Sequence, residues 1–557
     1  MFIIFFLLSF SQPSIRNVHS PDTHGQVEFE TPHEPPAHSD PAVWPQPTHR
    51  PIPPVPPKPP VQPDQPASNI VRASTGYYTG KFDPNFPDVR EFLNVPYAES
   101  TAGKNRFMPP VPVSKSDDHH DATAYGRVCP QFVSALPSVW SEQIPWYRIP
   151  HEASEKGETA ALSGEDCLSM AIWTPANATE NSKLPVAMFW PGGGFQTNGI
   201  LVPAHQPAQW VSRSQSHVVV TINYRLGILG FPDAAGAKEQ NLGLLDQRLA
   251  LEWVKDNINS FGGDATKIMV WGFSAGAQAV DFHNYAYYEN PIARSFFSQS
   301  GSCLAFGSGH ASDHSKFTFV AKKFGCEFED EPVEELTCMQ EPAFRDIVDF
   351  IGLYHGDQRL RFGPVTDQRT VFSDYKERYA EGKVSQVPMI YSSAANDGAV
   401  LASYNAQHPE SAPDQETVNT ITQRILCGAA ESSRLRHGIN LTTYRYQYAG
   451  VWPNQNPLSW MGAYHSSDLP MLFGTYDVGT GDSVLPMETE TSIKMQDFLL
   501  SFLQDPHHIA GWPEENILAL GHGDLLRFGA KVKPVQRVDA LDVDGVCYGS
   551  MPYDPFP

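Results

Sequence analysis

The sequence predicts an α/β fold with a large, mostly parallel central sheet and helices on both of its faces. Between residues 184 and 271, three continuous apolar runs alternate with glycine-rich turns and one helical pattern. Strands without polar alternation are typical of a sheet that is covered on both sides. The third run leads into a serine flanked by glycines, the pattern of a strand that turns sharply into a helix. With 557 residues, 41% of them hydrophobic, the chain can build such a core.

Composition narrows the possible functions. The chain has 39 Lys and Arg against 62 Asp and Glu, a formal net charge of −23. This balance argues against nucleic acid and anionic membranes as partners, because both attract a basic surface. The seven cysteines form no CxxC pair, and we expect no metal and no cofactor. The sequence gives no indication of the oligomeric state.

The first 68 residues are expected to lie outside the folded domain. The apolar run at residues 2–8 is too short for a membrane span and predicts a signal peptide over residues 1–20, although no Lys or Arg precedes it. A mis-assigned start or a disordered apolar tip is the alternative. Residues 31–66 contain 15 prolines, so residues 21–68 are interpreted as a proline-rich disordered segment. The catalytic domain is then predicted to span residues 69–557.

The elements follow in order. Residues 184–190 and 217–224 are dense in apolar and β-branched side chains and predict two buried strands. Between residues 241 and 260 the apolar positions recur at helical spacing, and residues 268–271 predict a third strand. Strand, crossover helix and strand form the βαβ unit of a parallel sheet.

The third strand ends in the sequence GFSAG at residues 272–276, followed by a helix-competent stretch. The glycines allow the backbone to pass sharply around Ser274, which presents its hydroxyl at the start of a helix. The alternative is a turn serine that only caps the helix.

A serine nucleophile needs a base and an orienting acid, which in this arrangement follow in the order serine, acid, histidine. The best candidate for the base is His465, in a loop after the strand-like residues 443–448. The best candidate for the acid is Asp397, which follows the strand-like residues 387–391. Each residue could instead be non-catalytic, since most histidines are structural and Asp-Gly is a common turn sequence.

These motifs resemble the type-B carboxylesterase/lipase family, which includes cholinesterases and secreted fungal members and has the α/β-hydrolase fold. The resemblance covers nearly the whole domain. It is found in residues 95–98, 106–107, 165–168, 223–227, 230–231, 243–247, 257–258, 261–276, 397–398, 465 and 473–474.

The resemblance implies that Ser274 is the nucleophile, His465 the base and Asp397 the orienting acid. It also implies an oxyanion hole, which consists of backbone N–H groups of Gly193, Gly194 and Ala275. The activity implied is hydrolysis of a small-molecule ester.

Three positions depart from the family pattern. Pro191 replaces the usual His before the three glycines, Phe273 replaces the usual Glu before the serine, and Asp397 replaces the usual Glu acid. The missing carboxylate at position 273 makes hydrolysis of cationic choline esters doubtful and favours neutral carboxylic esters.

The resemblance also implies disulfides Cys129–Cys167 and Cys326–Cys338. Among the remaining cysteines we expect a Cys427–Cys547 pair and a free thiol at Cys303. Disulfides require an oxidising compartment, which supports secretion. The sequons at residues 177–179 and 440–442 are consistent with a glycoprotein.

The loop between Cys129 and Cys167 is rich in aromatic residues. It corresponds to the lid of lipases in the family, so its side chains either cover the substrate or pack the loop onto the domain. Arg106 and Glu165 resemble a structural ion pair at its base.

We therefore expect a secreted serine ester hydrolase. A lipase, sterol esterase or thioesterase and a non-catalytic cholinesterase-like interaction module are the alternatives. The complete serine, acid and histidine set favours an enzyme over the interaction module.

Overall fold

The computed structural model describes residues 69–557 except 151–155, 307–308, 310, 329, 357–359, 513–522 and 532. The expected signal peptide (1–20) and proline-rich segment (21–68) lie outside the described residues. No helix among those described is both long and apolar enough to span a membrane.

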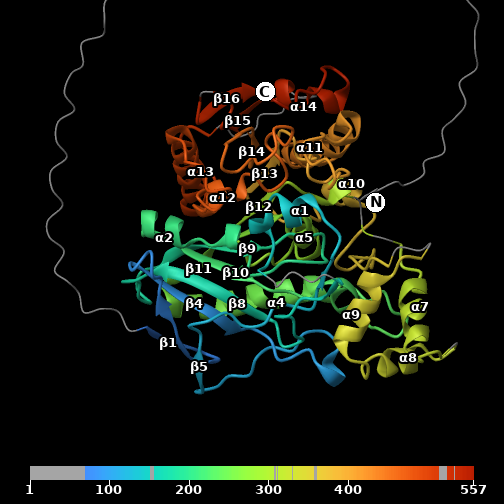
Figure 1. Ribbon diagram of the computed structural model, residues 1–557. Helices are drawn as coiled ribbons and strands as arrows, with labels where there is room; N and C mark the ends of the chain where they lie inside the picture. Colours follow the sequence, from blue (N-terminus) through green and yellow to red (C-terminus); the bar gives the residue numbers. More distant parts are fainter. Residues whose placement is uncertain are drawn as a thin grey trace, which may run out of the picture. The chain divides into compact units, whose positions relative to one another are not determined.

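The largest sheet in the described part of the chain has eleven strands. The seven strands from β15 to β10 pair in parallel, and the edge strands pair antiparallel. The mostly parallel sheet predicted from the sequence is therefore confirmed. Its strands, in order across the sheet, are β16 (Val535–Asp539), β15 (Asp524–Phe528), β14 (Thr443–Tyr448), β13 (Met389–Ala394), β12 (Ser295–Gln299), β11 (Gly263–Phe273), β9 (Leu184–Trp190), β10 (Val218–Ile222), β8 (Ser169–Pro175), β4 (Val89–Pro96) and β3 (Lys81–Phe82). Figure 1 labels most of them.

The three strands expected from the apolar runs correspond to β9, β10 and β11. Strand β11 is longer than expected, because it begins at Gly263 and reaches Phe273 directly before the serine. Strands β10 and β11 are joined by the predicted crossover helix but are not neighbours, since β9 lies between them. The order of strands depends on long-range pairing, which local periodicity does not report.

The side chains of the central strands alternate between two buried clusters. On β9, Ala187 and Phe189 belong to one cluster, and Val186 and Met188 belong to the other. This alternation follows from the two-residue period of a strand. Because both faces are covered, every residue of β9 after Leu184 is buried.

Helices cover both faces, as predicted. Helices α4 and α5 contribute to the cluster that contains Val186, and α2, α12 and α13 contribute to the one that contains Phe189. The α-helices are α1 (Val139–Glu142), α2 (Ala208–Ser214), α3 (Gly227–Gly230), α4 (Leu242–Asn257), α5 (Ala275–Ala286), α6 (Cys303–Phe306), α7 (Ser315–Lys323), α8 (Pro332–Cys338), α9 (Phe344–Leu353), α10 (Tyr375–Ala380), α11 (Gln415–Gly438), α12 (Leu469–Phe473), α13 (Pro486–Gln504) and α14 (Leu541–Asp544).

Two small sheets complete the described structure. The first sheet has three strands in the order β1-β2-β5, and the second consists of β6 paired with β7. Their bounds are β1 (Ile70–Ala73), β2 (Gly76–Thr79), β5 (His119–Asp121), β6 (Phe132–Val133) and β7 (Glu158–Thr159).

The described residues contain three disulfides, Cys129–Cys167, Cys326–Cys338 and Cys427–Cys547, whose partners lie 38, 12 and 120 residues apart in the sequence. Cys303 is a buried free thiol. The expected pairings are thus all present in the structure.

Candidate active site

The serine turn connects β11 to α5. Ser274 has φ 55° and ψ −117°, a strained conformation between the last strand residue and the first helix residue. A Cβ on Gly272 would lie 2.2 Å from the Gly276 carbonyl oxygen, and a Cβ on Gly276 would lie 2.0 Å from the Trp190 carbonyl oxygen. Only glycine fits at either position, which explains the GFSAG sequence. Ser274 itself is half-buried.

The acid and the histidine are brought together by the next strands. Asp397 follows β13 and His465 follows β14, its parallel neighbour. Beyond the strands, Asn396 forms a β-bridge with Tyr464, so the residues that follow each of them become adjacent. The His465 Nδ1 and Asp397 Oδ1 atoms are 2.7 Å apart, and both side chains are buried.

Two further groups hold the carboxylate. Asp397 Oδ2 accepts hydrogen bonds from the Ala394 N–H at 2.7 Å and the Ser300 hydroxyl at 3.2 Å. Sequence reasoning missed Ser300, which follows β12, the strand next to β13. Ser300 could be identified only from the pairing of β12 with β13, and this pairing cannot be deduced from the sequence.

The strand that leads to the serine contacts the histidine. Phe273, the residue before Ser274, lies with its ring centroid 4.6 Å from that of His465. This contact brings the turn that carries Ser274 close to the His465–Asp397 pair. All three residues follow parallel strands at their carboxyl ends, where α/β folds bind ligands.

The glycine loop after β9 lies against the serine. A Cβ on Gly192 would be 2.9 Å from Ser274 Cβ. Gly193 and Gly194 have φ of 114° and 63°, a region in which glycine is favoured. The Gly193 carbonyl accepts from the N–H groups of residues 196 and 197, at 3.0 and 3.2 Å. These bonds fold the loop into a tight turn beside Ser274, the residue that precedes α5.

A second buried carboxyl group adjoins the site. Asp468 receives a 2.9 Å hydrogen bond from the Tyr446 hydroxyl. Burial, with a smaller contribution from Asp397, raises the pKa of Asp468 to about 6. Sequence reasoning did not single out this residue, although it lies three positions after His465.

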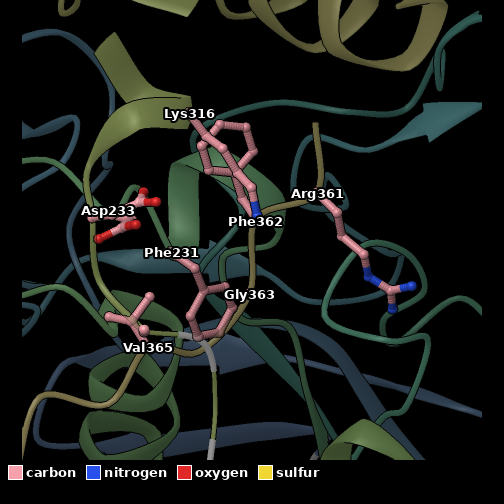
Figure 2. Close-up of a pocket in the computed structure, with 9 residues that line it drawn as sticks. Phe231, Asp233, Lys316, Arg361, Phe362, Gly363 and Val365 are labelled. Carbon is pink, nitrogen blue, oxygen red and sulfur yellow. The ribbon is translucent and has the colours of Figure 1, made fainter. Parts of the chain in front are cut away.

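A cavity of about 170 Å³ lies near the glycine loop and apart from the serine. Its lining includes Asp233, Lys316, Arg361 and Phe362. Figure 2 shows that the Arg361 side chain extends away from the side of the cavity where Asp233 lies. Its Nη2 atom donates to the Gly194 carbonyl at 3.2 Å. Within the described residues, no three His, Cys, Asp or Glu side chains gather into a group that could hold a metal.

The aromatic loop between Cys129 and Cys167 packs onto the domain in its described part. Trp146 and Tyr147 are buried, and the Tyr147 ring lies edge-on to Tyr464, 6.1 Å between centroids. At its base, Arg106 Nε donates to Glu165 Oε1 at 2.6 Å, the ion pair that the resemblance implies.

Together, the mostly parallel sheet and the serine turn define an α/β hydrolase. The profile of the carboxylesterase family matches residues 67–438. A chlorogenic acid esterase of Aspergillus niger is 37% identical over 503 residues, which cover 86% of this chain and 94% of that protein. Secreted lipase 5 of Gibberella zeae is 36% identical over 476 residues, covering 80% and 88%.

The chain therefore belongs to the carboxylesterase family, and it is a carboxylic ester hydrolase. Among solved structures, a PNB esterase superposes with a TM-score of 0.69 at 20% identity, covering 87% of this chain and all of that one. At this identity, the likeness confirms the α/β-hydrolase fold alone.

Proposed function

We propose that this protein is a secreted serine esterase that cleaves neutral carboxylic esters through an acyl-enzyme intermediate. In this proposal, Ser274 is the nucleophile, His465 the base and Asp397 the orienting acid. The observation that supports it most is the buried 2.7 Å contact between His465 Nδ1 and Asp397 Oδ1. The strained backbone of Ser274, directly after the Phe273 that packs on His465, supports it further. A carboxylate at Nδ1 fixes the tautomer in which Nε2 is free to accept a proton.

The reaction proceeds in two halves. Nε2 of His465 removes the Ser274 proton as the oxygen attacks the ester carbonyl, and the imidazolium then gives this proton to the leaving alcohol. Water attacks the acyl-enzyme with the help of the same base and releases the acid. Backbone N–H groups of Gly193, Gly194 and Ala275 stabilise the oxyanion in both halves, and loss of one such donor costs about 3 kcal/mol of barrier.

The proposed preference for neutral esters rests on Phe273. This residue places an apolar ring rather than a carboxylate beside the base, so the site lacks that source of attraction for a cationic alcohol. Similarity to both a chlorogenic acid esterase and a lipase supports ester hydrolysis and keeps a lipase as the alternative.

Secretion is supported by three disulfides, which persist in oxidising compartments. The name of the Gibberella zeae relative, a secreted lipase, points the same way. Both sequon asparagines, Asn177 and Asn440, are exposed and could carry glycans.

The test is hydrolysis of p-nitrophenyl esters from acetate to palmitate by the wild type and by Ser274→Ala. We expect turnover that is lost in the variant, while its thermal unfolding is unchanged. A preference for short acyl chains supports an esterase, and a preference for long chains supports the lipase alternative. Activity retained by a folded Ser274→Ala protein contradicts the proposal.

A further inference from the structure

We infer that Phe273 is a positioning residue for the base: its ring restrains the His465 imidazole and stabilises the imidazolium that forms during the reaction. This inference rests on the proposed function of His465. It assigns a role to the aromatic side chain that directly precedes Ser274.

The first observation is the contact itself. The Phe273 and His465 ring centroids are 4.6 Å apart with an interplanar angle of 39°. An aromatic ring attracts a cation that lies over its face within about 6 Å of the ring centroid. Phe273 and His465 are 6% and 2% exposed, so water does not screen the interaction as it does at a surface.

The second observation is that the phenyl ring is confined on another side. A Cβ on Gly192 would lie 2.9 Å from the Phe273 Cδ1 atom and 2.7 Å from the Phe273 carbonyl oxygen. The ring therefore lies against the glycine loop as well as against the imidazole. The Phe273 backbone is fixed because it belongs to β11. The contacts with the loop and the imidazole then leave the ring little room to rotate. A ring held in this way limits the tilt of the imidazole, whose Nδ1 edge is already tied to Asp397.

The third argument concerns charge. When Ser274 loses its proton to Nε2, a buried imidazolium forms, and a buried cation is costly unless nearby groups compensate it. The Asp397 carboxylate compensates it at Nδ1. The aromatic face adds attraction from a direction in which an aliphatic side chain would supply none.

Other titratable groups near the base lie on different elements. Asp397 follows β13, Asp468 precedes α12, and Tyr446 on β14 donates to Asp468. Tyr553 in the C-terminal segment donates a hydrogen bond to the Ala395 carbonyl, two residues before Asp397. None of these residues belongs to β11. A substitution at position 273 therefore changes the side chain that packs on the imidazole of His465, while these residues stay in place.

The experiment compares Phe273→Leu with Phe273→Tyr, which keeps the ring. The pH profile of kcat/KM is measured with p-nitrophenyl butyrate, and NMR of ¹³C-labelled histidine follows the imidazole directly, assigned with His465→Gln. Phe296→Leu is the matched control, because Phe296 is also buried and lies 5.9 Å from a histidine outside the site, His283.

In Phe273→Leu we expect kcat/KM to fall about 3- to 30-fold, the range given by cation–π energies. The ascending limb of the pH profile should move to lower pH, because loss of the ring favours the neutral imidazole. Phe273→Tyr should restore both values, and Phe296→Leu should leave the limb where it is in the wild type. Phe273→Met replaces the leucine variant if that protein does not fold.

An unchanged limb and an unchanged histidine titration in a folded Phe273→Leu protein would overturn the inference and leave Phe273 as packing alone. Failure of Phe273→Tyr to restore the profile would also contradict it. A wild type without esterase activity would instead refute the proposed function, and the NMR titration would still decide whether the ring stabilises the imidazolium.

Discussion

Replacing Asp397 with asparagine should reduce turnover severely while preserving the fold. One carboxylate oxygen accepts from two groups, the Ala394 N–H at 2.7 Å and the Ser300 hydroxyl at 3.2 Å. In the variant, the amide oxygen is best placed towards these donors. The NH2 group then faces Nδ1 of His465, which must act as an acceptor and carry its proton on Nε2. In that tautomer, Nε2 cannot remove the Ser274 proton.

The expected loss of kcat for Asp397→Asn is about 10⁴-fold, or about 5 kcal/mol of barrier, as is found when a triad carboxylate is replaced by its amide. Ser300→Ala is the matched control. It removes one hydrogen bond to the same carboxylate and should cost no more than about tenfold. The assay is hydrolysis of p-nitrophenyl butyrate at neutral pH, with thermal unfolding to verify the fold. A folded Asp397→Asn protein within about tenfold of the wild type would refute this reasoning.

Three further predictions concern the base, stability and domain organisation. His465→Gln should abolish turnover in a folded protein, and full activity would redirect the search to another histidine. Replacing Cys427 and Cys547 with serine removes a crosslink between residues 120 apart and should lower the free energy of unfolding by about 4 to 5 kcal/mol; an unchanged denaturation midpoint would contradict it. Removal of residues 1–68 should leave kcat/KM unchanged, and a folded but inactive truncated protein would contradict the proposed domain boundary.

The buried Asp468 predicts a pH dependence of stability. Its pKa in the folded protein is raised from 3.8 to about 6, so the folded state binds this proton more tightly than the unfolded state. This tighter proton binding stabilises the folded state. The stabilisation is fully present below pH 3.8 and is lost as the pH rises through about 6. Asp468→Asn should remove this component, which is about 3 kcal/mol at most. Parallel urea titrations of the two proteins across this range test it, and identical pH dependences would contradict it.

The sequence predicts the central strands well because their apolar runs are local and continuous. Residues 184–190 coincide with β9, and residues 443–448 coincide with β14. The insertion of β9 between β10 and β11 was not predictable, because it depends on which strands pair across the sheet. The extension of β11 back to Gly263 was missed because residues 263–267 lack the apolar pattern of the core.

The candidate site divides in the same way. The turn at Ser274 was predictable from its flanking glycines. The close contact of Gly272 with the Gly276 carbonyl belongs to that local turn, whereas the contact of Gly276 with Trp190 of β9 is tertiary. Asp397 and His465 were selected by their order in the chain and by family resemblance, and only the bridge between Asn396 and Tyr464 explains why they meet. Ser300 and the packing of Phe273 on His465 are tertiary contacts without a local signature.

The most direct test of the central claim is covalent labelling with a fluorophosphonate, followed by peptide mass spectrometry. A serine activated by His465 should react once per chain, the added mass should map to Ser274, and labelling should disappear in Ser274→Ala. An active enzyme that labels at a different residue, or that does not label at all, would contradict the assignment of Ser274 as the nucleophile.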